Sequence, residues 1–176
     1  MDIEYSDGQE IEGRILRLIR EAADRSSAHA IAGEHYGQAW PIRYHLCPER
    51  SNLLRPFDFT DLDVLELGAG MGAVSRFLAE KARSLYVVEG TRPRFEVLSE
   101  RLADLPNWDG EVGNFQTFQT DRRFDVVCLV GVLEYSELFL KGTGESPHLW
   151  LLKRCRQFLK PGGVLLVAIE NALGLK

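Results

Sequence analysis

Residues 64–72 read Val-Leu-Glu-Leu-Gly-Ala-Gly-Met-Gly, and this stretch decides the fold class. Its apolar start predicts a short buried strand, and Gly68, Gly70 and Gly72 permit a sharp turn directly after it. Residues 72–82 continue with the composition of a helix. The free N–H groups at the start of a helix favour an anionic group, so the stretch predicts a ligand site.

Strand and helix patterns alternate beyond this stretch. Strands are expected at residues 84–90, 111–115, 124–132 and 164–170, and helices at 93–104 and 146–160. Pro161-Gly162-Gly163 is expected to end the last helix. The alternation and the near-continuous apolar strands predict an α/β fold, a Rossmann-like doubly wound parallel sheet with helices on both faces.

The first 58 residues are expected to form a helical and irregular extension, and residues 59–176 the Rossmann-like core. The apolar spacing over residues 10–26 predicts an amphipathic helix. Residues 27–45 are expected to be irregular or partly helical, and Pro48 is suited to the first turn of a short helix over 48–54.

Composition excludes several classes of function. The formal net charge of the 176 residues is −5, which argues against nonspecific binding to nucleic acid. No apolar run approaches the ~20 residues of a membrane span, so no membrane insertion is expected. Cys47, Cys128 and Cys155 are widely spaced, which predicts neither a disulfide framework nor a metal site and favours the cytoplasm.

Two carboxylates near the glycine turn indicate a nucleoside ligand. Glu89 ends the second expected strand and can accept hydrogen bonds from both hydroxyls of a ribose. NAD and S-adenosylmethionine both carry such a ribose. Glu66 lies in an apolar strand, where a buried acid needs a partner or a function, and this favours methyl transfer over hydride transfer. The Tyr-x-x-x-Lys pair of short-chain reductases is absent, since Tyr135 is followed four places on by Phe139.

The order of these segments resembles the class I S-adenosylmethionine-dependent methyltransferases. VLELGAGMG is similar to their first motif, LYVVEG to their second and FDVVCLVGVLEY to their fourth. LLKRCRQFLKPGGVLLVAIE is similar to the helix, turn and fifth strand that follow, so the resemblance covers residues 62–170. YHLCPERSNLLRPF, GVLEY and IENALGLK further resemble methyltransferase domains of bacterial surface-polysaccharide clusters, which often occur beside glycosyltransferase domains. That resemblance implies O-methylation of a sugar or glycan intermediate.

The resemblance also implies which residues contact S-adenosylmethionine. The glycine turn would hold the methionine half, Glu89 the ribose, and Asn114 the adenine amino group, where the family usually has an acid. Phe115 would cover the adenine face, and Val130 and Gly131 would lie beside the sulfonium. The expected cofactor-binding residues are Glu66, Gly68, Ala69, Gly70, Gly72, Glu89, Gly90, Asn114, Phe115, Val130 and Gly131.

Candidates for a catalytic base are few. Glu134 follows the fourth strand, where ligands bind in such sheets, and His148 opens the next helix. His29, His35 and His45 lie in no base motif and are expected to be surface or structural residues. Arg50 is an alternative partner for the cofactor carboxylate, and Tyr36, Trp40 and Tyr44 are candidates to cap the cleft.

A complete class I core has seven strands, whereas five are expected here. We therefore expect that the native chain continues beyond Lys176 and that an exposed sheet edge favours a homodimer. Two alternatives to an active methyltransferase stay open: a non-catalytic cofactor-binding or scaffold module, and an NAD-dependent oxidoreductase.

Overall fold

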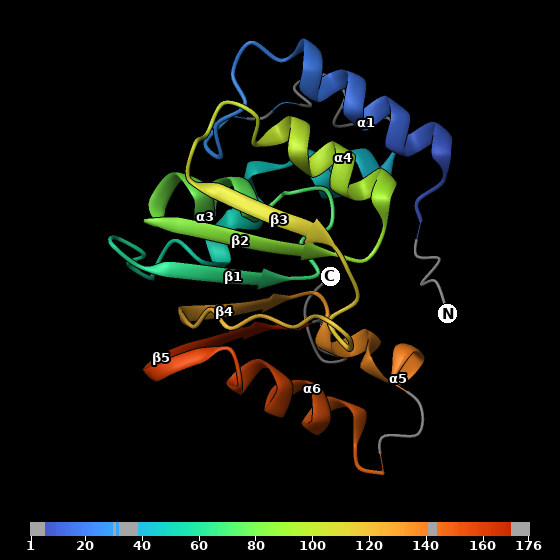
Figure 1. The fold of residues 1–176 in the computed structure, drawn as a ribbon. Helices are drawn as coiled ribbons and strands as arrows, with labels where there is room; N and C mark the ends of the chain where they lie inside the picture. Colours follow the sequence, from blue (N-terminus) through green and yellow to red (C-terminus); the bar gives the residue numbers. More distant parts are fainter. Residues whose placement is uncertain (1–5, 30, 32–38, 141–143, 170–176) are drawn as a thin grey trace.

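The computed structural model describes residues 6–29, 31, 39–140 and 144–169. Their five strands form one parallel sheet in the order β3-β2-β1-β4-β5 (Figure 1). The strands are β1 (Asp63–Leu67), β2 (Ser84–Glu89), β3 (Trp108–Val112), β4 (Phe124–Val130) and β5 (Leu159–Ala168). The predicted α/β fold class is confirmed.

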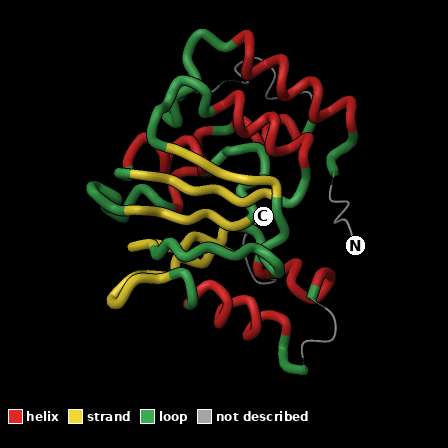
Figure 2. The backbone as a smooth tube through the Cα atoms, viewed as in Figure 1, coloured by secondary structure: helices red, strands yellow, loops and turns green. Residues whose placement is uncertain are grey.

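Helices connect the strands and cover both faces of the sheet (Figure 2). They are α1 (Gln9–Glu21), α2 (Trp40–Leu46), α3 (Ser75–Lys81), α4 (Arg92–Arg101), α5 (Ser136–Phe139) and α6 (Pro147–Arg156). Two 3-10 helices, η2 (Pro48–Leu53) and η3 (Leu133–Tyr135), precede β1 and follow β4. No helix in the described ranges is both long and apolar enough to cross a membrane.

The alternation of side chains along β1 divides the core into two layers. Val64 packs in the cluster that contains Leu78 of α3 and Leu98 of α4. Leu65 packs on the opposite face, in the cluster that contains Leu151 of α6. Burial on both faces explains why the central strands are apolar throughout.

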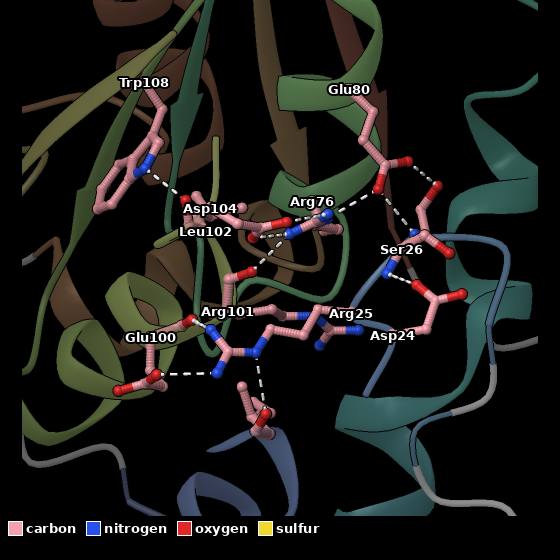
Figure 3. Close-up of polar contacts among 12 residues, drawn as sticks. Asp24, Arg25, Ser26, Arg76, Glu80, Glu100, Arg101, Leu102, Asp104 and Trp108 are labelled. Carbon is pink, nitrogen blue, oxygen red and sulfur yellow. Dashed lines mark hydrogen bonds and ion pairs between the residues drawn. The ribbon is translucent and has the colours of Figure 1, made fainter. Parts of the chain in front are cut away.

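The N-terminal extension packs on the outer side of α4. Ile15 and Ile19 of α1 are fully buried and share a cluster with Val97 of α4. Beside this cluster, the Arg25 guanidinium donates to the Glu100 carbonyl at 2.8 Å and pairs with the Glu100 carboxylate at 3.1 Å (Figure 3). The extension therefore shares a hydrophobic core with the sheet domain.

Several predicted boundaries were wrong. The first helix ends at Glu21 rather than near Ser26, and the helix after the glycine turn begins at Ser75 rather than Gly72. The third strand spans Trp108–Val112 rather than 111–115. Trp108 fixes its start by pairing with Leu85 and donating its indole N–H to the Leu102 carbonyl at 2.9 Å.

Pro161-Gly162-Gly163 lies within β5 and does not end the preceding helix, which ends at Arg156. The register with β4 jumps here, because Phe124 pairs with Leu159 and Val126 with Val164. Lys160 anchors the irregular segment through its ammonium group, 2.9 Å from Asp63 and 2.8 Å from Asp125. A proline and two glycines suit such a bulge, since it interrupts the ladder of hydrogen bonds.

Candidate cofactor-binding site

A pocket opens at the carboxyl ends of β1, β2 and β4. The chain continues from β1 to one side of the sheet and from β4 to the other, so the pocket lies at the topological switch point, where ligands bind in sheets of this kind. Residues of α2 and η2 form its outer wall. The lining includes ten of the eleven residues predicted to bind a cofactor: Glu66, Gly68, Ala69, Gly70, Glu89, Gly90, Asn114, Phe115, Val130 and Gly131.

The glycines of the turn serve two functions: some line the pocket, and one allows close packing against α4. Gly68 and Gly70 line the pocket with φ angles of +75° and +58°, which side chains of L-residues rarely permit. Gly72 also has a positive φ, but it does not belong to the lining. A Cβ there would lie 3.3 Å from Leu98 Cγ, so Gly72 serves the close packing of the turn against α4.

Glu89 connects the second strand to the glycine turn. Its Oε2 accepts a hydrogen bond from the Gly70 N–H at 2.8 Å, and its Oε1 accepts one from the Thr91 N–H at 3.0 Å. Glu89 is 5% exposed and lines the pocket. The Thr91 hydroxyl also donates to Oε1 at 3.2 Å. A carboxylate has about four acceptor sites, so Glu89 can still accept one hydrogen bond from a ligand, at Oε2.

Glu66 and Arg50 place a carboxyl group and a guanidinium group at one end of the pocket. Both line it, and each has a buried polar atom, Glu66 Oε2 and Arg50 Nε, without a hydrogen-bond partner among the described residues. Burial raises the pKa of Glu66 to about 7. Unsatisfied buried polar atoms are rare in folded proteins and indicate a ligand that would complete their hydrogen bonds.

Asn114 and Phe115 lie where the chain leaves β3. The Asn114 side-chain oxygen accepts a hydrogen bond from the Gln116 N–H at 2.8 Å, which closes a turn and leaves one lone pair of this oxygen available. Phe115 is 9% exposed and packs in the core while also lining the pocket. Together they give this end of the pocket an apolar face beside an amide group.

A model of the methyltransferase domain family matches residues 65–165, which is more than half of the chain. The chain belongs to the class I S-adenosylmethionine-dependent methyltransferases. The match favours methyl transfer over the NAD-dependent alternative.

Proteins similar to this methyltransferase include three N-methyltransferases. The cypemycin N-terminal methyltransferase of a Streptomyces species is 30% identical over 109 residues, 62% of this chain and 41% of the relative. The chain therefore spans less than half the length of this curated relative. The phosphoethanolamine N-methyltransferase 1 of Haemonchus contortus, solved with phosphoethanolamine and S-adenosylhomocysteine, has a TM-score of 0.62 at 17% identity; the match covers 95% of this chain and 36% of that chain.

The glycopeptide N-methyltransferase MtfA, solved with S-adenosylmethionine, is 26% identical with a TM-score of 0.53, over 68% of this chain and 52% of that chain. These relatives support the family. They do not support the predicted connection with surface-polysaccharide clusters.

The methyltransferase pocket also contains residues that sequence patterns did not single out. Arg94 lines it, and His45, predicted to be a surface or structural residue, lines it as well and is 4% exposed. The His45 Nε2 lies 3.0 Å from the Asp7 carboxylate, which also pairs with Arg94 at 3.3 Å. Burial lowers the pKa of His45. Asp7 and Arg94 are distant in the sequence, and no local pattern indicates their proximity.

The remaining sequence candidates lie at different distances from the pocket. Tyr44 lines it, whereas the side chain of Trp40 is mostly exposed. His148 is not among the lining residues and faces Glu137 at 3.9 Å on the surface. His29 is exposed, and His35 and Tyr36 lie outside the described residues.

Proposed function

We propose that this methyltransferase domain binds S-adenosylmethionine in the pocket and transfers its methyl group to a small-molecule nucleophile. The observation that carries the proposal is the set of three ionisable groups in one cavity: Glu89 at the end of β2, and Glu66 and Arg50 with unsatisfied polar atoms. A nucleoside attached to a zwitterionic amino acid matches this set.

Each part of the cofactor has a complementary group in the pocket. Glu89 would accept a hydrogen bond from a ribose hydroxyl, and Phe115 with Asn114 would provide the surface for adenine. Glu66 faces the ammonium group and Arg50 the carboxylate, which completes the hydrogen bonds that both lack among the described residues. Gly131, at the end of β4, lies on the side where the methyl group would be offered.

When bound, the cofactor would supply an electrophilic methyl group with its sulfur as the leaving group, and the acceptor would supply the lone pair for the new bond and lose a proton. The residues of the chain align the two reactants and exclude water from them. Alignment is the main catalytic task, because the sulfonium is already a good leaving group.

The acceptor belongs to one of two classes. The resemblance to polysaccharide-cluster domains favours a sugar hydroxyl. The three relatives are N-methyltransferases, and they favour an amine. A cofactor-binding module without turnover is the alternative function. It is favoured by Asn114, whose side-chain oxygen already serves a turn where the family usually has an acid.

Turnover tests the proposal directly. The chain is incubated with S-adenosylmethionine and with separate pools of small amines and of free sugars, and S-adenosylhomocysteine is measured by mass spectrometry. We expect release that depends on one pool and exceeds the rate without acceptor. Tight cofactor binding with no release above that rate in either pool would contradict turnover and support the module without activity.

A further inference from the structure

The side chains of Tyr44 and Glu134, which come from distant segments, both approach Gly131, one of the residues that line the pocket. A Cβ built on Gly131 would lie 3.7 Å from the Tyr44 hydroxyl and 3.7 Å from Glu134 Oε1. Tyr44 comes from α2 in the extension and Glu134 from η3, directly after β4. Tyr44 lines the pocket, whereas Glu134 is not among the lining residues and approaches the pocket only through its Oε1, beside Gly131.

Glu134 forms no ion pair with any residue that the structure describes. Its Oε2 is buried and forms no hydrogen bond within the described ranges, although its Oε1 reaches the space beside Gly131. A carboxylate removed from water without a hydrogen bond is unfavourable by several kcal/mol. This loss is offset if a ligand supplies N–H donors to the group.

Tyr44 is held in its orientation from two sides. The Arg50 guanidinium lies over its ring, 3.9 Å from the centroid, and the His45 ring packs edge-on with a centroid distance of 5.0 Å. His45 is in turn bound to Asp7. The ring of Tyr44 is thus clamped while its hydroxyl reaches Gly131, which leaves the hydroxyl oxygen as an acceptor towards the pocket.

We infer that Tyr44 and Glu134 bind the acceptor, and that the acceptor is an amine; this inference rests on the proposed function. An amine carries two or three N–H donors, which match the carboxylate of Glu134 and the hydroxyl oxygen of Tyr44. When the amine arrives protonated, one N–H bond breaks, the proton passes to Glu134, and the electron pair stays on nitrogen as the attacking lone pair. A hydroxyl acceptor offers one donor and no positive charge to this carboxylate.

Fragment binding tests the inference independently of turnover. The full chain is saturated with S-adenosylhomocysteine, and the binding of benzylamine and benzyl alcohol is measured by ligand-observed NMR for the wild type, Glu134→Gln and Tyr44→Phe. We expect benzylamine to bind more tightly than benzyl alcohol to the wild type. Glu134→Gln should weaken benzylamine about tenfold or more and leave benzyl alcohol unchanged. Tyr44→Phe should weaken benzylamine by a smaller factor.

Glu137→Gln is the matched control, because Glu137 is exposed on the neighbouring helix α5. It should leave both probes unchanged, and all variants should keep the wild-type affinity for S-adenosylhomocysteine. Equal binding of the two probes, a preference for the alcohol, no binding of the amine, or an unchanged amine affinity in Glu134→Gln would overturn the inference. Failure of S-adenosylhomocysteine to bind the wild type would instead overturn the proposed function.

Discussion

Glu66 is a carboxyl group at the inner end of the cofactor pocket, with a pKa raised to about 7 by burial. In the unfolded chain its pKa is near the ordinary value of 4.5. The native state therefore keeps its proton at pH values where the unfolded state has lost it. Stability falls wherever the native state binds more protons than the unfolded state.

We expect Glu66 to lower the free energy of unfolding as pH rises from about 4.5 to about 7, by a total on the order of 3 kcal/mol. Glu66→Gln should remove this decrease, because its amide does not ionise. Urea denaturation at a series of pH values measures the effect, with Glu96→Gln as an exposed control. Identical pH dependence in the wild type and Glu66→Gln would show that Glu66 is ionised throughout.

Individual site residues differ in how far the sequence predicts them. Gly68 and Glu89 were predicted because each follows directly from the end of a buried strand, and parallel strands end at one edge of a sheet. Gly72 was grouped with them by spacing alone, whereas its position is set by packing against Leu98. Tyr44 was a candidate to cap the cleft and does line the pocket, whereas His45 and Arg94 gave no sequence signal as pocket residues, because their position depends on how the extension packs across α4.

At the scale of elements, the N-terminal extension forms one wall of the site. Asp7, just before α1, joins His45 of α2 to Arg94 of α4. His45 and Arg94 both line the pocket. The extension is therefore tied to the site by a charged contact as well as by its apolar core.

We expect Asp7→Asn to weaken this attachment by about 1.5–3 kcal/mol, the usual contribution of a hydrogen bond to a charged group. Amide hydrogen exchange in α1 and α2 should become faster, and the affinity for S-adenosylhomocysteine should fall. Asp121→Asn, at an exposed position, is the control. Unchanged exchange in α1 together with unchanged affinity would show that Asp7 contributes nothing to the site.

Strands that are continuous apolar runs were predicted from the sequence, whereas the positions of strands with polar or irregular segments were not. β1, β2 and β4 are short apolar runs that lie in the middle of the sheet, and their positions follow the pattern. β3 is an edge strand that contains Asp109 and Gly110, so its register depends on pairing with β2 rather than on local propensity. The bulge in β5 was mistaken for a helix stop because proline and glycine suit both structures.

At the scale of the whole molecule, one edge of the described sheet carries exposed apolar side chains. β5 is the last strand in the order, and Val164, Val167 and the nearby Ile169 are 51%, 41% and 53% exposed. An apolar edge strand with free backbone groups pairs readily with another chain.

We expect the chain to self-associate through β5 in a concentration-dependent manner, and Val167→Lys to shift it towards the monomer. Lysine places a charge on the edge and retains the backbone pairing of β5 with β4. Sedimentation velocity over a range of concentrations measures the shift. Leu149→Lys, which changes an exposed apolar residue on α6, is the control. Association of equal strength in both variants would place the contact elsewhere.

The central claim is that the pocket at the ends of β1 and β2 selects S-adenosylmethionine and holds its ribose through Glu89. Calorimetric titration with S-adenosylmethionine and with NAD, on the wild type, Glu89→Ala and the exposed control Glu96→Ala, tests it most directly. We predict saturable binding of S-adenosylmethionine alone, weakened about 100-fold or more in Glu89→Ala and unchanged in Glu96→Ala. Binding of NAD, or full retention of S-adenosylmethionine affinity in a folded Glu89→Ala variant, would contradict the claim.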